Sequence, residues 1–439
     1  MSFTDYRAFR GSGRYGEFAQ KIASQDRELG ERLEAVQRLF DGCRQYVRKQ
    51  KSAVTNIIIG LLSLNPQNPM PEHVVARLRK EWGPKHFEAM LTGICAHVLL
   101  MGDPGRAKTV LCTVMAASVD ASFERIQCTP DLDPSDVTGS AIPQADGSVE
   151  YLTGPIESNI VLADEVNRAT GKTHSAILQP MAEGELTRNI NRGKRAEQMD
   201  RKVILPRPFY VVATMNPVDQ EGVYALTEAQ KDRFAMQIAM SGIGTRDLVK
   251  VMRMNESQYI KSAVKKVLTL DELLEIRHWI HNNVVLGDEV ALYAARLAKA
   301  FVAYNDLPID DEDEDPAFLA AMAELHRVPL QPFELGEKAY SVGDLIQGAM
   351  YERMGIVVSS LAKTLAFLRG RRYVWPEDVA KMFPHVARHR VTLTREAEAL
   401  VRQRIRTPDR RLLDRIELVE RVIRHILRFV SVPKLEKAA

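Results

Sequence analysis

Residues 96–109 read AHVLLMGDPGRAKT, in which a short apolar run leads directly into a glycine-containing turn. From Gly102 to Thr109 the turn matches the phosphate-binding loop pattern G-x-x-x-x-G-K-[ST] at every fixed position but one, because Ala107 stands where the pattern has its second glycine. Residues 110–119 then show helical apolar spacing. A strand, a tight loop and a helix in this order predict a loop whose backbone N–H groups bind phosphate together with the helix N-terminus.

The side chains of this loop suit a nucleoside triphosphate with its metal ion. Lys108 would neutralise phosphate charge, and the Thr109 hydroxyl would ligate Mg²⁺, so we expect ATP and Mg²⁺ as ligands. The alternative is an ordinary Gly-Pro turn, which Ala107 favours and the position between a strand and a helix disfavours. The residues expected to bind the nucleotide are Gly102, Asp103, Pro104, Gly105, Arg106, Ala107, Lys108, Thr109 and Val110.

Two further apolar runs also end in polar residues. Residues 159–163 lead to Asp164 and Glu165, and residues 209–214 lead to Asn216. Apolar strands that alternate with helical segments predict an α/β fold with a parallel sheet, in which ligands bind at the carboxyl ends of the strands. Asp164 would hold the metal, Glu165 would polarise the attacking water, and Asn216 would orient that water. Taken alone, acids at a strand end and an Asn-Pro turn are common loop features.

Arg233 is a further candidate, in the stretch EAQKDRF at residues 228–234. A guanidinium group can stabilise the charge that develops on a transferred phosphoryl group. The alternative is a surface ion pair with Asp232 or Glu228.

Composition narrows the class of protein. The chain has 439 residues, of which 45% are hydrophobic and 27% charged, as in a soluble globular protein with two or three domains. The net charge of +3 argues neither for nor against nucleic acid. The four cysteines are widely spaced and indicate neither a zinc site nor a disulfide framework, which fits the cytoplasm. Residues 57–64, the longest apolar run, are far fewer than the ~20 that span a bilayer.

In combination these motifs resemble the MoxR family of AAA+ ATPases, in the helix-2-insert group. The matching segments are residues 96–109, 125–140, 154–186, 207–234 and 368–393. The resemblance implies an αβα P-loop core with a parallel sheet, followed by an all-α helical lid, with ATP between them. It also implies a homo-oligomeric ring, usually a hexamer. Ala107 then matches the AKT variant of the loop that this family uses.

The resemblance also implies roles for single residues. Lys108 and Thr109 match the Walker A pair, and Asp164 and Glu165 match Walker B. Asn216 matches the first sensor.

Two arginines carry the remaining roles. Arg233 matches the finger that reaches the ATP of the neighbouring subunit. Counting back from Gly370 and Arg371 puts the second sensor at Arg353, although the usual Ser-Pro-Arg-Ala context is missing there.

The expected domain order follows from the same match. The N-terminal arm covers residues 1–30, and the core covers 31–240 with an inserted segment near 65–93. The lid covers 241–394 with an acidic insertion near 305–338, and a helical extension covers 395–439. From Thr245 onward only helical periodicity is evident, including one helix over 342–368.

Smaller features are expected within these domains. The resemblance implies two hairpins in the core, one over 141–153, where Gln-Ala-Asp-Gly supplies a turn, and one near 186–205 with a basic tip. The extension should present an apolar stripe that packs on the lid or on a neighbouring subunit. The stripe consists of Leu413, Ile416, Val419, Ile423, Ile426 and Val430.

We therefore expect a ring-forming ATPase that remodels or activates a partner protein. The resemblance suggests a partner with a von Willebrand factor A-like domain, or another client. One alternative is a nucleotide-dependent scaffold with little turnover, which the intact Asp164 and Glu165 pair disfavours. The other is a nucleic-acid motor, for which the Arg-rich C-terminal helices are the only support.

Overall fold

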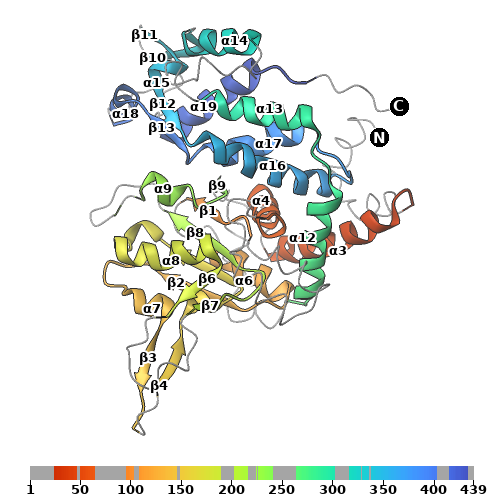
Figure 1. Cartoon of the computed structure of the whole chain (residues 1–439), viewed down its shortest axis with the longest axis vertical. Coiled ribbons are helices and arrows are strands. Elements are labelled where there is room, and N and C mark those ends of the chain that lie inside the picture. The colour runs from red at the N-terminus through yellow and green to blue at the C-terminus, as the bar shows by residue number, and fades with distance from the viewer. Residues whose placement is uncertain are drawn as a thin grey trace. The chain divides into compact units, whose positions relative to one another are not determined.

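The fold is described from a computed structural model of the chain (Figure 1). The structure describes residues 24–46, 50–64, 95–102, 108–145, 149–188, 202–215, 224, 226–240, 264–301, 316–327, 329–335, 338–402 and 415–433. The chain forms two compact units. The first comprises residues 1–284 and 364–372, and the second comprises residues 285–363 and 373–439.

A parallel sheet organises the first unit. Within the described residues its five strands lie in the order β2-β5-β8-β1-β9, and each neighbouring pair is parallel. The strands are β1 (Val98–Met101), β2 (Phe123–Gln127), β5 (Ile160–Asp164), β8 (Tyr210–Met215) and β9 (Met236–Ala239). Every residue of β1 and β5 is buried, as expected for parallel strands that are covered on both faces. The α/β core with a parallel sheet is therefore confirmed.

Helices cover both faces of this sheet. On one face, Leu99, Val161 and Val211 share a core cluster with residues of α8 (Gly171–Glu183). The alternate side chains, such as Leu100 and Leu162, are equally buried and face the opposite layer. The other α-helices in the described part of this unit are α3 (Arg27–Tyr46), α4 (Lys51–Leu62), α6 (Lys108–Ser118), α7 (Pro134–Thr138), α9 (Glu228–Lys231) and α12 (Leu270–Asn283), with the end of α16 (Tyr351–Leu368).

Gly60 allows α4 to approach the sheet closely. A Cβ atom at Gly60 would lie 2.5 Å from the Tyr210 hydroxyl and 2.8 Å from the Ala96 carbonyl oxygen. The Tyr210 hydroxyl donates a hydrogen bond to the Ile57 carbonyl oxygen at 2.9 Å. A larger residue at position 60 would break this contact between helix and strand.

Two antiparallel hairpins are inserted in the first unit, and both were predicted. β3 (Gly139–Pro143) pairs with β4 (Val149–Thr153), and β6 (Glu185–Thr187) pairs with β7 (Lys202–Ile204). The β3–β4 hairpin projects away from the five-stranded sheet (Figure 1). The expected basic tip of the second hairpin, residues 191–195, lies outside the described residues.

The second unit is largely helical, so the helical lid is confirmed. Its helices are α13 (Asp288–Lys299), α14 (Pro316–Arg327), α15 (Val342–Leu345), α17 (Pro376–Ala387), α18 (Arg395–Arg402) and α19 (Arg415–Phe429), together with most of α16 (Tyr351–Leu368). In α19, Val419, Ile423 and Ile426 are buried, and the helix contacts α14 and α17. The described part of the predicted apolar stripe therefore packs within this unit, and Leu413 lies outside the described residues.

The prediction of helices alone in this half is wrong. β10 (Pro329–Leu335) pairs with β11 (Lys338–Ser341), and β12 (Ile346–Ala349) pairs with β13 (Val391–Leu393). The helix expected over 342–368 is therefore interrupted. Ser341 and Asp344 form a capping box around the short α15, and Ile346–Ala349 then continues as a strand before α16 begins.

The Arg-rich face of α19 is paired with acids. Arg421 lies 2.6 Å from Glu417, and Arg424 lies 2.9 Å from Glu420. Glu420 also accepts Arg388 at 2.8 Å, which ties α19 to the end of α17. These arginines of α19 are therefore paired within the unit, whereas the arginines of residues 403–414 lie outside the described residues, and the nucleic-acid alternative stays untested.

Candidate functional site

The carboxyl ends of the central strands meet at one edge of the sheet. Met101 lies opposite Met215, and Gln127 lies opposite Asp164. The Gly102 N–H donates to the Met215 carbonyl oxygen at 3.3 Å, which extends this register by one residue. Gly102, the first residue of the glycine loop, thus lies beside the strand that leads to Asn216. Asn216 itself and residues 103–107 lie outside the described residues.

Lys108 is buried at this edge. It is the first residue of α6, its exposure is 9%, and its Nζ donates to the Gly102 carbonyl oxygen at 3.1 Å. Thr109 and Val110 follow in the first turn of the helix and are partly buried. A helix N-terminus with an ammonium group and a hydroxyl group is a chemical environment that phosphate prefers.

Asp164 is held on both sides of its carboxylate. Its exposure is 8%. The Thr214 hydroxyl donates to Oδ1 at 2.5 Å, and Arg125 Nη2 donates to Oδ2 at 2.6 Å. The Cys128 N–H also donates to the Asp164 backbone carbonyl oxygen at 2.9 Å. The aspartate is therefore fixed at the end of β5 by residues from both neighbouring strands.

Glu165 has an unusual backbone conformation. Its φ of 55° lies in the left-handed region, which non-glycine residues rarely adopt. Its N–H donates to the Thr214 hydroxyl oxygen at 2.9 Å. Its carboxylate accepts Arg168 Nη1 at 3.0 Å and Gln127 Nε2 at 3.4 Å. Strain of this kind persists only where surrounding contacts hold it, and it is typical of functional sites.

Sequence reasoning missed three of the residues that make these contacts, namely Thr214, Arg125 and Gln127. Thr214 appeared only as part of an apolar strand, and Arg125 and Gln127 only as part of a family segment. Arg125 also contacts Gln127, and both point toward the two acids. Their spacing of two residues on β2 puts them on one face of the strand, which is the signal that could have revealed them.

Cys128 lies beside the acids but is not a reactive group. Burial, with a further contribution from the charges of Asp164 and Glu165, raises the pKa of its thiol to about 12. A thiol with such a pKa stays protonated at neutral pH and is a poor nucleophile.

Arg233 contacts α8 in this structure. It follows α9, and its Nη1 donates to the Leu178 carbonyl oxygen at 2.6 Å. Within the described part of the chain it forms no ion pair with Asp232 or Glu228. Arg353 is exposed at the start of α16, in the portion of that helix that belongs to the second unit. The roles suggested for both arginines remain predictions.

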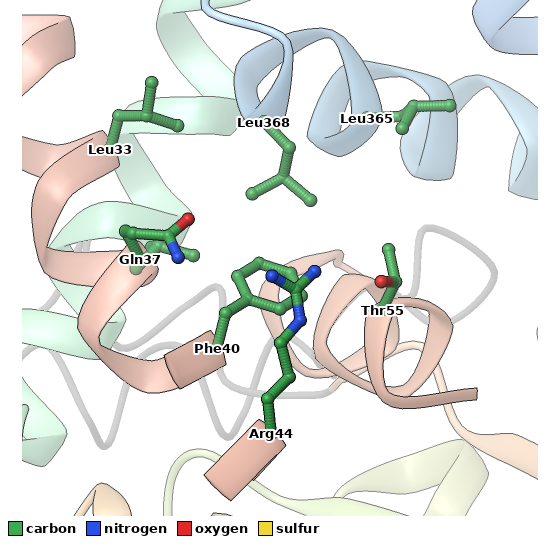
Figure 2. Close-up of a pocket in the computed structure, with 8 residues that line it drawn as sticks. Leu33, Gln37, Phe40, Arg44, Thr55, Leu365 and Leu368 are labelled. Atoms are coloured by element: carbon green, nitrogen blue, oxygen red, sulfur yellow. The ribbon is translucent and has the colours of Figure 1, made fainter. Parts of the chain in front are cut away.

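A small cavity in the helical layer of the first unit is separate from the strand ends. It has a volume of about 40 Å³ and lies among α3, α4 and the end of α16. Figure 2 shows Arg44 beside the ring of Phe40, and its guanidinium carbon is 5.2 Å from the ring centroid. The remaining lining is mainly aliphatic, as at Leu365 and Leu368. Neither Gly102 nor Lys108, the described residues on either side of the glycine turn, lines this cavity, which lies apart from the strand ends.

The residues at the strand ends fit a magnesium nucleotide. Phosphate prefers a cationic group at a helix N-terminus, which the buried Lys108 provides. Mg²⁺ prefers oxygen ligands, which a hydroxyl group at the helix start and a buried carboxylate provide. Lys108 would meet phosphate oxygens, and Thr109 and Asp164 would hold the metal.

Comparisons with known proteins agree with this geometry. The family model "ATPase family associated with various cellular activities (AAA)" matches residues 97–236, and the AAA lid domain matches residues 347–410. Chaperone MoxR1 of Mycobacterium tuberculosis is 35% identical over 71% of this chain and 72% of its own length. The uncharacterised protein YeaC of Bacillus subtilis is 31% identical over 70% of this chain and 83% of its own.

A solved structure supports the same fold. The crystal structure of a candidate ATPase from Cytophaga hutchinsonii matches with a TM-score of 0.59 and 30% identity, and the match covers 90% of this chain and 98% of that one.

The strand order, the glycine loop and the paired acids define a P-loop core of the AAA type. The relatives narrow this class further. The chain belongs to the MoxR family of AAA+ ATPases. Among the residues that the structure describes, no helix is long and apolar enough to cross a membrane.

Proposed function

We propose that the chain is a magnesium-dependent ATPase whose site lies at the carboxyl ends of the parallel sheet. The observation that carries this proposal is the Thr214 hydroxyl, which donates to Asp164 and accepts from the N–H of Glu165. A single side chain thereby fixes two adjacent acids beside the strand that contacts Gly102. Hydrolysis of ATP depends mainly on such positioning, because the transfer needs little covalent chemistry from the protein.

Each residue of the proposed site has a separate task. The loop from Gly102 to Val110 binds the phosphates, and Thr109 and Asp164 hold Mg²⁺. The bound metal ion supplies positive charge to the phosphate oxygens. Glu165 orients and polarises the attacking water, and Asn216 orients the same water from the next strand. The left-handed backbone of Glu165 supports this task, because it turns the residue away from the extended path of β5.

We further propose that the ATPase works as a ring, with six subunits as the expected number, in the cytoplasm. Arg233 would complete the site of the neighbouring subunit, and Arg353 would sense the nucleotide from the lid. The energy would remodel or activate a client protein, with a von Willebrand factor A-like domain as the expected partner. The name of the Mycobacterium tuberculosis relative, a chaperone, supports action on another protein.

The Glu165→Gln variant tests the chemistry. It preserves the size of the side chain and removes the carboxylate charge, so ATP binding should survive while phosphate release falls at least 100-fold. Phosphate release and binding of a fluorescent ATP analogue measure the two effects separately. Wild-type protein that binds ATP but releases no phosphate at any concentration would support the scaffold alternative instead.

A matched control is available on the same sheet. Glu124 lies on β2, is exposed and has no partner among the described residues. The Glu124→Gln variant makes the same chemical change away from the strand ends, and phosphate release should stay within about twofold of wild type. An equal loss in both variants would mean that the effect is not specific to Glu165.

A further inference from the structure

The two inserted hairpins meet at Arg188. This residue directly follows β6, and its Nη2 lies 2.7 Å from Glu157 Oε2. Glu157 ends the short helix η1 (Pro155–Glu157), which follows β4. The two side chains are only 16% and 11% exposed. An ion pair at this depth connects two segments that are 31 residues apart in the chain.

Tyr151 extends the contact along the first hairpin. The guanidinium carbon of Arg188 lies 4.2 Å from the centroid of the Tyr151 ring in β4. The Tyr151 hydroxyl donates to the Thr138 carbonyl oxygen at 2.7 Å, immediately before β3 begins. Arg188 therefore contacts one strand of the β3–β4 hairpin directly and reaches the start of the other through Tyr151.

The base of this hairpin is closely packed. Gly139 has a φ of +87°, and a Cβ atom there would lie 2.1 Å from the Leu152 carbonyl oxygen. A Cβ atom at Gly154 would lie 2.3 Å from the Val137 carbonyl oxygen. The hairpin pairs with no strand outside itself in the described parts of the chain. Close packing at the base, with no pairing to another strand, makes the contacts at that base the ones that hold the hairpin against the rest of the unit.

Both hairpins connect directly to strands of the proposed site. Only Ser158 and Asn159 separate Glu157 from β5, which ends at Asp164. β7 leads through residues 205–209 into β8, which ends beside Asn216. The Arg188–Glu157 pair therefore joins the segments that precede the two strands carrying the acids and the first sensor.

The Arg188–Glu157 contact should be disrupted when either partner is removed. Arg188 Nε and Glu157 Oε1 are buried without a hydrogen-bond partner, so each group depends on the other for compensation. Removing one partner leaves a charge in a low-dielectric setting, and this costs more than the pair itself contributes. Exchanging the two charges preserves the compensation.

We propose that Arg188 is a positioning residue that joins the β3–β4 and β6–β7 hairpins, so that a nucleotide-dependent shift in one is transmitted to the other. The inference rests on the proposed ATPase function, because it assumes that the hairpins respond to ATP.

Amide hydrogen exchange of the full-length protein tests the joint. Without nucleotide, Arg188→Glu and Glu157→Arg should each speed exchange in residues 139–153 about tenfold, and Arg188→Gln somewhat less. The double variant with both charges exchanged should return to within about threefold of wild type. Lys202→Glu is the matched control, because Lys202 pairs with Glu185 at 2.5 Å inside the β6–β7 hairpin. It should leave residues 139–153 unchanged.

The transmission is tested on the same samples with magnesium and a non-hydrolysable ATP analogue. In wild type, exchange should change in both hairpins. In Arg188→Glu it should change in residues 185–187 and 202–204 only, and the double variant should recover the joint response. Equal loosening by Lys202→Glu, no recovery in the double variant, or independent responses in wild type would each overturn the proposal. If the wild-type protein released no phosphate from ATP, that result would contradict the proposed ATPase function and leave the joint between the hairpins standing.

Discussion

Arg125 occupies one carboxylate oxygen of the acid that we propose to hold Mg²⁺. It lies 2.6 Å from Asp164 Oδ2, and the buried Thr214 holds Oδ1. We expect a cation that binds Asp164 through Oδ2 to compete with Arg125, whose side chain is 46% exposed. We expect Arg125→Ala to raise the affinity for the metal in the presence of an ATP analogue about three- to tenfold, an effect limited by solvent screening. Titration with Mn²⁺, followed by electron paramagnetic resonance, measures this change.

Arg168→Ala is the natural control for Arg125. It removes the same charge from the same edge of the sheet, but Arg168 pairs with Glu165 at 3.0 Å and not with Asp164. Metal affinity should rise clearly less in this variant. If both variants shifted it equally, the general charge of the edge would explain the result, and no displacement of Arg125 would be needed.

The sequence revealed the residues that lie in motifs and missed those defined by register. Lys108 and Asp164 follow strands in recognisable patterns, so their convergence at one edge could be predicted. Thr214 lies within an apolar run, and its role depends on the β5–β8 register, which puts it beside Asp164. The residue pattern of a single strand does not determine its register with the next strand. The same reason explains why Arg125 was overlooked, because its partner lies 39 residues away in the chain.

At the scale of elements, His97 ties two strands and a helix together. The Val211 N–H donates to His97 Nδ1 at 3.0 Å, and His97 Nε2 donates to the Met181 carbonyl oxygen of α8 at 3.1 Å. This pattern requires the neutral ring. Complete burial, with smaller contributions from the charges of Arg277 and Arg207, lowers the pKa of His97 to about 3.

The unfolded chain takes up the same proton near pH 6.5, so it binds more protons than the folded chain between pH 6.5 and about 3. The free energy of unfolding must therefore fall as the pH drops through this window. Protonation of His97 in the unfolded chain should lower it by about 2 kcal/mol between pH 7.5 and pH 5. Urea unfolding at the two pH values measures the fall.

Substitution by Gln isolates the contribution of His97. His97→Gln keeps a donor for Met181 and cannot titrate, so its loss of stability between pH 7.5 and pH 5 should be smaller than that of wild type by about 2 kcal/mol. An unchanged pH dependence in His97→Gln would mean that other groups control the acid sensitivity, such as His174, whose pKa burial also lowers.

Elements whose stability depends on distant partners were the least predictable. Helical spacing is visible in the sequence over 342–368, yet residues 346–349 form a strand. They pair with residues 391–393, more than 40 positions later in the chain. The spacing of apolar residues within the segment cannot reveal such a pairing, because the stabilising hydrogen bonds come from outside the segment. The helices on either side, α15 and α16, keep their own local signals and could be anticipated.

At the scale of the whole molecule, the first unit includes a segment from late in the chain. Residues 364–372 group with residues 1–284. Ser63 Oγ and Thr364 Oγ1 share a buried hydrogen bond of 2.7 Å, and Arg372 pairs with Asp26 at 2.5 Å. Sequence reasoning expected the core and the lid as successive stretches, because it follows the chain and cannot see contacts over 300 residues.

The ring is the remaining proposal at this scale, and Arg233 allows a test of it. Within one chain its guanidinium group donates to the Leu178 carbonyl oxygen. In the proposed ring it would exchange this contact for a phosphate of the neighbouring subunit. Arg233→Ala should therefore keep ATP binding and lose hydrolysis at least 100-fold. Lys108→Ala should lose ATP binding itself.

Mixing these two inactive proteins should restore activity, because the defects belong to different halves of each intersubunit site. An Arg233→Ala subunit keeps Lys108, and its Lys108→Ala neighbour can supply Arg233. Random assembly from an equal mixture makes such an arrangement at about a quarter of the interfaces, so phosphate release should recover to about a quarter of the wild-type rate. A mixture of Lys108→Ala and Glu165→Gln is the control, because both changes disable the same half and no interface regains a complete site. Recovery in neither mixture would contradict a shared site, and equal recovery in both would show that exchange of Arg233 between subunits is not its cause.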